Sequence, residues 1–99
     1  MDDYTLNWPP DFDDFAWELE SKGWFVGLEV VVGDRILRPT FYDPIRLSQD
    51  MDAELRSSGI FTQPVIIVIK RLSRESIEAA IEKLASEGQL GRITGHGDL

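Results

Sequence analysis

Residues 24–43 read WFVGLEVVVGDRILRPTFYD, and this stretch decides the fold. Two runs rich in β-branched and aromatic residues, 24–32 and 35–43, flank the dipeptide Gly33-Asp34. Glycine suits the positive φ that a two-residue hairpin turn requires. The sequence therefore predicts a β-hairpin of two long strands at the centre of the fold.

Pairing outward from this turn produces one apolar face and one mixed face. The apolar face is expected to hold four pairs: Val32 with Arg35, Val30 with Leu37, Leu28 with Pro39 and Val26 with Phe41. The other face is expected to hold Val31 with Ile36, Glu29 with Arg38, Gly27 with Thr40 and Phe25 with Tyr42. A charge pair and an aromatic pair at opposite positions favour this register, since cross-strand neighbours stabilise a sheet. A shift by one residue would exchange the two faces.

Three amphipathic helices are expected around the hairpin. One is capped by Asp11 and runs to about Lys22, one starts at Asp43-Pro44 and runs to about Ser58, and one is capped by Ser73 and stopped by Gly88. Their apolar stripes are Phe12, Phe15, Ala16 and Leu19 in the first, Leu47, Met51 and Leu55 in the second, and Ile77, Ala80, Ile81, Leu84 and Ala85 in the third. We expect each stripe to be buried.

Two further strands complete an α+β fold of order (β)αββαβα. A short strand is expected at Tyr4 to Trp8. A longer strand is expected over Ile60 to Arg71, and its apolar run Val65 to Ile69, with Ile67 at its middle, favours an interior position. Residues 1–90 are expected to form a single-domain two-layer sandwich, and 91–99 a flexible C-terminal tail.

Two layouts of this sandwich are open. One is a split βαβ (ferredoxin-like) sheet with an extra C-terminal helix. The other is a three-stranded mixed sheet with three helices, in which the first strand does not form. Pro39 disfavours the first layout, because that layout makes the strand 35–43 central and proline has no N–H to donate.

Acidity is concentrated at the N-terminus. The first twenty residues contain seven acidic side chains and no basic one, out of a formal charge of −8 for the whole chain. The same segment contains five aromatic residues, which disordered acidic tails usually lack. This composition predicts a folded acidic surface that contacts a basic protein partner, and it disfavours binding to nucleic acid.

Trp17 is the main candidate for partner binding. At about 100° per residue it points away from the apolar stripe, among Asp13, Asp14, Glu18 and Glu20. Two positions are open to it: packed under the N-terminal strand or the tail, or exposed as an aromatic anchor ringed by carboxylates. These five residues are the predicted partner-binding site.

Phe25 and Tyr42 form a second candidate surface. As a register pair they are either buried under the N-terminal helix or free as a sheet face for another copy of the chain. The second possibility allows a homodimer.

No constellation for catalysis is visible in the sequence. The chain contains no cysteine and a single histidine, His96, which is flanked by glycines near the C-terminus. Asp11, Asp13 and Asp14 lack the spacing of a calcium loop, and no glycine-rich segment stands between a strand and a helix as a phosphate loop does. We therefore expect a protein that is not an enzyme and has no cofactor and no metal.

Two functions fit these expectations. The first is a small acidic interaction protein that neutralises or regulates a basic protein, as immunity proteins, antitoxins and nucleic-acid mimics do. The alternative is a small-molecule-binding or regulatory α+β module that dimerises through its sheet face. The absence of cysteine, of a signal-peptide pattern and of a long apolar segment favours a cytoplasmic location without membrane insertion.

Overall fold

The predicted hairpin forms, although each of its strands is broken once. The computed structural model describes residues 3–63 and 65–93. Next to the turn, β3 (Glu29–Val32) pairs antiparallel with β4 (Arg35–Leu37), and Val30 lies opposite Leu37 as predicted. Glu29 also forms its expected ion pair, with Oε2 3.1 Å from Nη2 of Arg38. The register near the turn is therefore confirmed.

Farther from the turn the register is shifted by one residue. Here β2 (Trp24–Phe25) pairs with β5 (Thr40–Tyr42), and Phe25 lies opposite Phe41. The predicted pairings of Val26 with Phe41 and of Phe25 with Tyr42 are wrong. Gly27 has φ 119°, a backbone conformation that residues with a side chain rarely adopt. The segment between β2 and β3 is one residue longer than the opposite segment between β4 and β5, as in a β-bulge. Phe25 is consequently buried and Val26 is 48% exposed.

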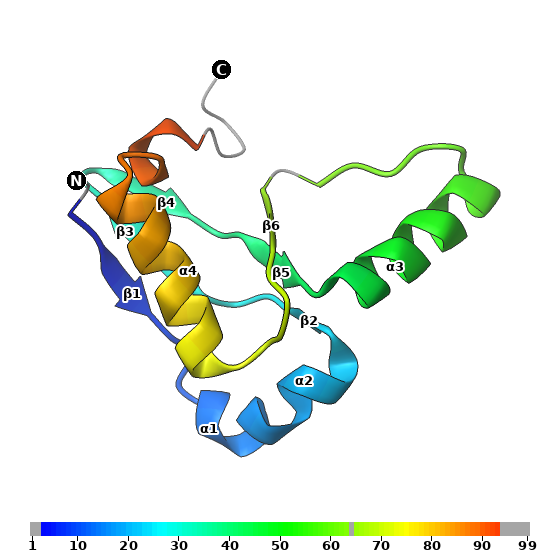
Figure 1. Ribbon diagram of the computed structural model, residues 1–99, viewed down its shortest axis with the longest axis horizontal. Coiled ribbons are helices and arrows are strands. Elements are labelled where there is room, and N and C mark those ends of the chain that lie inside the picture. Colours follow the sequence, from blue (N-terminus) through cyan, green and yellow to red (C-terminus); the bar gives the residue numbers. More distant parts are fainter. Residues whose placement is uncertain (1–2, 64, 94–99) are drawn as a thin grey trace.

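The broken strands build two sheets instead of one. β1 (Thr5–Asn7), β3 and β4 form an antiparallel sheet, while β5 is central in a second sheet between β2 and the parallel strand β6 (Ile66–Val68). Pro39 lies buried between β4 and β5, where the chain leaves one sheet for the other (Figure 1). Its missing N–H therefore interrupts no ladder. The α+β class is confirmed, and the N-terminal strand exists.

β6 covers only Ile66–Val68 of the strand predicted over residues 60–71, and it lies at the edge of its sheet, so the prediction of a long interior strand is wrong. Ile67 is half-buried against the core, and Val68 is 46% exposed. Edge strands have one unpaired side, and this side is covered by no strand among the residues described.

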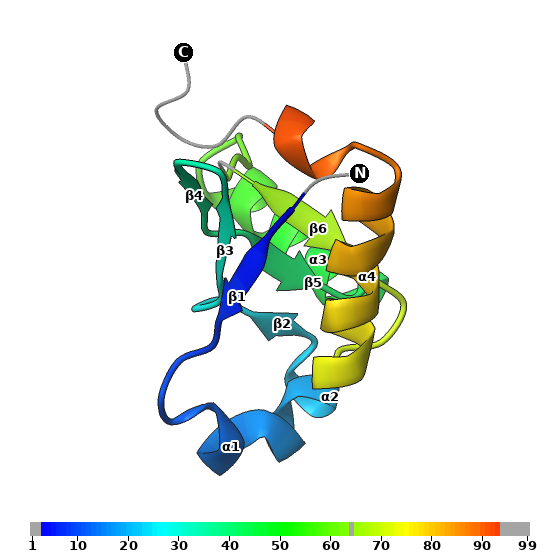
Figure 2. The same cartoon turned by 90° about the vertical axis from the view of Figure 1, so that its left-hand side faces the viewer.

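One hydrophobic core lies between the hairpin and α4 (Arg74–Ser86), which Figure 2 shows running alongside the strands. Ser73 caps this helix as predicted, accepting a hydrogen bond from the Ser76 N–H at 3.1 Å. The buried core residues are Phe12, Leu19, Phe25, Leu28, Val30, Leu37, Phe41, Leu72, Ile77, Ile81, Ala85 and Leu90.

The N-terminal helical region is irregular rather than one continuous helix. Its predicted apolar face is correct, since Phe12 and Leu19 are buried and Phe15 and Ala16 pack against the core. Asp11 occupies the N-cap position, but its side chain makes no capping hydrogen bond, so the predicted cap is wrong. The segments are α1 (Phe12–Phe15), the 3₁₀ turn η1 (Ala16–Glu18) and α2 (Leu19–Lys22).

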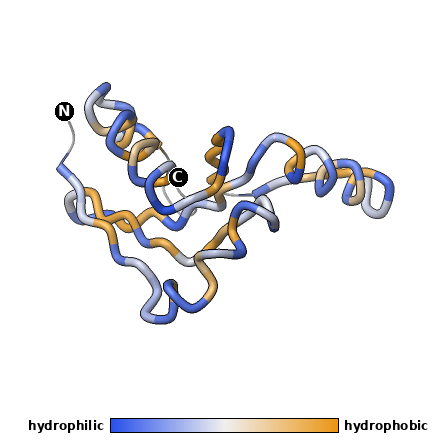
Figure 3. The backbone as a smooth tube through the Cα atoms, turned by 60° about the horizontal axis from the view of Figure 1, so that its bottom comes forward, coloured by the Kyte–Doolittle hydropathy of each residue, from blue (hydrophilic) through white to orange (hydrophobic). Residues whose placement is uncertain are grey.

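The helix α3 (Pro44–Ser57) extends away from the rest of the molecule (Figure 1). Its start is as predicted, because the Asp43 carboxylate accepts from the Arg46 N–H at 2.7 Å. No residue of α3 is buried, and the prediction of a buried stripe is wrong. Met51 and Leu55 are 38% and 49% exposed, and they line an open groove together with Val68 of the edge strand β6. Figure 3 shows apolar segments along this projecting helix.

The fold extends beyond Leu90. The 3₁₀ turn η2 (Leu90–Arg92) buries Leu90, and Nη1 of Arg35 donates to the Gly91 carbonyl oxygen at 2.9 Å. The Arg35 guanidinium also donates to the carbonyl oxygen of Ile93. The remainder of the predicted tail, residues 94–99 with His96, lies outside the described residues.

Candidate functional site

Trp17 is exposed, which decides between the two positions that its sequence context left open. It lies in η1 on the side opposite the buried Phe12 and Leu19, and 77% of its surface is accessible. Its indole Nε1–H donates to the backbone carbonyl oxygen of Asp14 at 3.2 Å. This hydrogen bond ties the ring to its own helical turn while most of the indole surface stays open to solvent.

Three of the carboxylates around Trp17 have basic neighbours, and two of these neighbours come from a distant part of the sequence. Glu18 pairs with Lys22 at 3.1 Å, Glu20 lies 3.8 Å from Arg71, and Asp13 lies 3.7 Å from Arg74. Asp14 makes no ion pair with residues 3–63 or 65–93. Exposed pairs of this kind are weak and easily exchanged. The acidic surface is thus less negative than the sequence suggests, but its carboxylates remain accessible to another cation.

An aromatic cluster holds this surface in place. Trp8 and Phe12 have ring centroids 4.5 Å apart, and Phe12 contacts Phe25 edge-on at 5.4 Å. The Arg74 guanidinium lies 5.0 Å from the Trp8 ring centre, within the range of a cation–π contact. The segment around Trp17 is therefore attached to the core and to the start of α4.

Phe25 and Tyr42 do not form an exposed sheet face. Phe25 lies in the core near Phe12 and Phe41, with ring centroids 5.4 and 6.4 Å away. Tyr42 is also buried, and its hydroxyl points toward α3, where it donates to Oδ2 of Asp50 at 2.9 Å. The structure separates these two residues and leaves neither accessible to a second chain.

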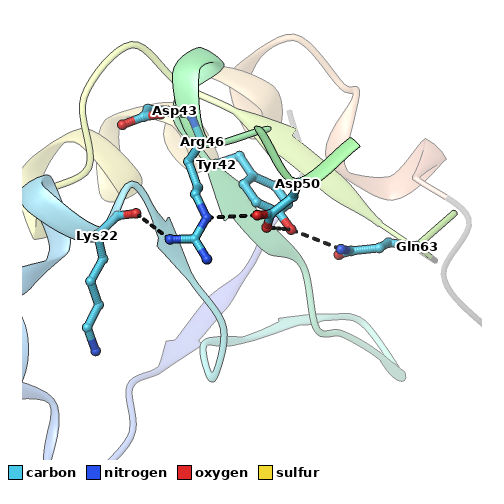
Figure 4. Close-up of polar contacts among 6 residues, drawn as sticks. All are labelled: Lys22, Tyr42, Asp43, Arg46, Asp50 and Gln63. Atoms are coloured by element: carbon cyan, nitrogen blue, oxygen red, sulfur yellow. Dashed lines mark hydrogen bonds and ion pairs between the residues drawn. The ribbon is translucent and has the colours of Figure 1, made fainter. Parts of the chain in front are cut away.

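Tyr42 instead belongs to a polar network that sequence reasoning missed (Figure 4). The Gln63 side-chain amide donates to the Tyr42 hydroxyl at 3.0 Å, and the Arg46 Nε donates to Oδ1 of Asp50 at 2.9 Å. The Arg46 guanidinium also donates to the Lys22 carbonyl oxygen at 3.2 Å, which links α2 to α3. The only signal in the sequence was the helical i, i+4 spacing of Arg46 and Asp50.

A hollow of about 570 Å³ opens beside this network, between α3 and residues 58–63. Tyr42, Asp50 and Gln63 line one part of it. Glu54, Ile60 and Phe61 line another part, so the hollow combines carboxylates with apolar surface.

Burial raises the pKa of the Tyr42 hydroxyl above its ordinary value of 10.0, and the Asp50 carboxylate raises it further. The folded state therefore favours the neutral hydroxyl. The resulting stabilisation is present in full below the ordinary pKa and is lost as the pH rises through the higher pKa of the folded state.

We expect Tyr42→Phe to be less stable than the wild-type protein at neutral pH, by about 1 kcal/mol for the lost hydrogen bonds. This difference should shrink above about pH 10, because only the wild-type protein must then ionise a buried phenol. Urea unfolding at neutral and alkaline pH measures this difference in the free energy of unfolding, and Tyr4→Phe is the control. A difference that stays constant across this pH range would contradict the ionisation of Tyr42 as its cause.

No protein-family model matches this chain, and neither a curated protein nor a solved structure matches it. Among the described residues, no group of three or more His, Cys, Asp and Glu side chains is arranged to hold a metal ion. No helix in the same part of the chain has the length and apolarity needed to cross a membrane.

Proposed function

We propose that this protein is a non-enzymatic binding module that recognises a basic protein partner through the surface of α1, η1 and α2. The observation that carries the proposal is Trp17, a tryptophan that is 77% exposed and hydrogen-bonded to its own helical turn. Large aromatic side chains are over-represented among the residues that dominate binding energy. A fixed indole loses little conformational entropy on binding.

The surrounding charges indicate the chemistry of the partner. Asp13, Asp14 and Glu20 are exposed next to Trp17, and Glu18 is partly exposed. Carboxylates placed around an aromatic centre attract a cationic surface and speed its encounter. Neutralisation or regulation of a basic protein, as in immunity proteins, antitoxins and nucleic-acid mimics, is the proposed role.

Capture of the partner tests this proposal. The immobilised protein should retain a basic protein from an extract of its source cell, and the retained fraction should fall as the salt concentration rises. Retention of an acidic protein, or binding that is indifferent to salt, would contradict the proposed role.

The double change Asp13→Asn with Asp14→Asn should slow association with that partner about threefold to tenfold and flatten its salt dependence, because peripheral charges mainly steer the encounter. Stopped-flow or surface-plasmon-resonance measurements provide the rate. Glu82→Gln with Glu87→Gln is the matched control, since it removes the same charge from the far half of α4 and from the residue that follows this helix (Figure 1). Equal slowing in both double variants would mean that only net charge matters and would argue against this surface.

A second candidate function is a regulatory module that dimerises, and the exposed apolar surface of α3 favours it. Leu47 and Leu55 lie at equal distances in the sequence before and after Met51 on α3. Two antiparallel copies of α3 would therefore place Leu47 of one chain against Leu55 of the other across a two-fold axis. Sedimentation velocity tests this function: a mass that rises with concentration supports it, and a monomeric mass throughout contradicts it.

A further inference from the structure

We infer that the hollow between α3 and residues 58–63 binds an arginine side chain of the same basic partner. This inference rests on the proposed function, which supplies a basic partner. The hollow would make a second contact in addition to the Trp17 surface.

The floor of the hollow is fixed before any ligand enters. The Tyr42 hydroxyl is buried between Asp50 and Gln63 and bonded to both, at 2.9 and 3.0 Å (Figure 4). Because the Gln63 amide nitrogen donates to Tyr42, its carbonyl oxygen remains able to accept a hydrogen bond. The Gln63 carbonyl oxygen can thus accept a hydrogen bond from a ligand that carries several donors.

The opposite wall is held close to the end of α3. Gly59, at φ 83°, reverses the chain after the helix. The Ser58 hydroxyl lies 3.1 Å from the carbonyl oxygens of both Glu54 and Ile60, which ties the returning segment to the last turn of α3. The hollow is therefore formed by a turn with defined contacts.

Glu54 supplies the negative charge that a cation can reach. Both oxygens of Asp50 already have partners, one in Arg46 and one in Tyr42. Glu54 is exposed and makes no ion pair with residues 3–63 or 65–93. Arg46 does not line the hollow, because its guanidinium reaches the Lys22 carbonyl oxygen instead. The Glu54 charge in the lining of the hollow is consequently not neutralised by any basic side chain within residues 3–63 or 65–93.

The apolar lining matches the stem of a basic side chain. Ile60 is 66% exposed, and Phe61 is half-buried beside it. Arginine has an aliphatic stem that covers apolar surface, and its planar guanidinium stacks on aromatic rings and has five donors and no acceptor. Glu54, the Gln63 carbonyl oxygen and the Phe61 ring can satisfy these features together. A neutral ligand would leave the Glu54 charge uncompensated.

Titration with a small arginine compound tests the inference without the partner. N-acetylarginine methylamide, added to the full chain, should shift the NMR amide signals of Glu54, Ile60 and Phe61 and the side-chain amide of Gln63. N-acetylcitrulline methylamide has nearly the same shape but no charge. We expect it to bind at least about fivefold more weakly than the arginine compound. Equal binding of the two compounds, or shifts confined to other residues, would overturn the inference.

Glu54→Gln should weaken binding of the arginine compound about fivefold. Glu82→Gln, which changes another exposed glutamate, in α4, should leave the affinity for this compound unchanged. Unaltered affinity in Glu54→Gln would also overturn the inference. This outcome is distinct from failure of the proposed function, because the titration requires neither the partner nor Trp17. A chain that binds arginine here but captures no basic protein would refute the proposed function and leave this site in place.

Discussion

Phe41→Ala is expected to lower the free energy of unfolding by about 3–5 kcal/mol. Phe41 is fully buried in β5, the central strand of its sheet, and its ring stacks near Phe25 with centroids 6.4 Å apart. Removing the ring leaves a cavity that neighbouring strands cannot fill without leaving their ladders. Urea denaturation monitored by circular dichroism measures the loss.

Val26→Ala is the control for this prediction. Val26 directly follows β2, the strand that pairs with β5, but its side chain is 48% exposed. Its truncation should therefore lower the free energy of unfolding by about 0.5 kcal/mol or less. A loss below about 1 kcal/mol in Phe41→Ala would contradict the central position of β5. A loss in Val26→Ala as large as that of a buried residue would contradict the one-residue shift that pairs Phe41 with Phe25 and exposes Val26.

Trp17→Ala is expected to weaken binding of the basic partner by about 30-fold or more, which corresponds to about 2 kcal/mol. The indole is the largest exposed aromatic group of the proposed surface, and its loss removes the contact that charges alone cannot replace. Stability should hardly change, because the side chain is 77% exposed. Isothermal titration calorimetry measures the affinity, and thermal unfolding checks the fold.

Ile36→Ala provides the matched control for Trp17→Ala. Ile36 is an exposed apolar residue of β4, which belongs to the other end of the molecule (Figure 1). Its loss should leave partner affinity unchanged. If Trp17→Ala bound normally, the acidic surface would be a solvated face, and dimerisation through α3 would become the better account. If it unfolded the protein, Trp17 would have a structural role instead.

Features set by neighbouring residues could be predicted from the sequence. The turn at Gly33-Asp34 and the caps Asp43 and Ser73 each depend on a few adjacent positions, and the structure contains all three. The direction of Trp17, away from the apolar stripe, followed from helical periodicity, whereas its exposure did not.

The bend of the hairpin could not be predicted, because alternation of side chains continues through the break. Only Gly27 and Pro39 distinguish the break in the sequence, and either residue is also compatible with an edge or a continuous strand. An extra residue at Gly27 moves Phe25 into the core and exposes Val26. One local insertion thus reversed the predicted roles of neighbouring side chains.

The environment of each site depends on segments that are distant in the chain. Arg71 and Arg74 approach the acidic surface from the region before and at the start of α4, and nothing in the first twenty residues indicates them. An amphipathic pattern such as that of α3 predicts an apolar face but not what covers it. For the same reason the hollow formed by Tyr42, Glu54 and Phe61 had no signature in the sequence.

The most direct test of the proposed function is an NMR footprint of the partner on this protein. The chain contains three tryptophans, so its indole N–H signals can be followed individually. Binding should shift or broaden the Trp17 indole signal and the backbone amides of α1, η1 and α2. An unchanged Trp17 signal in a saturated complex, with all perturbations on β4 or the far half of α4, would contradict the account.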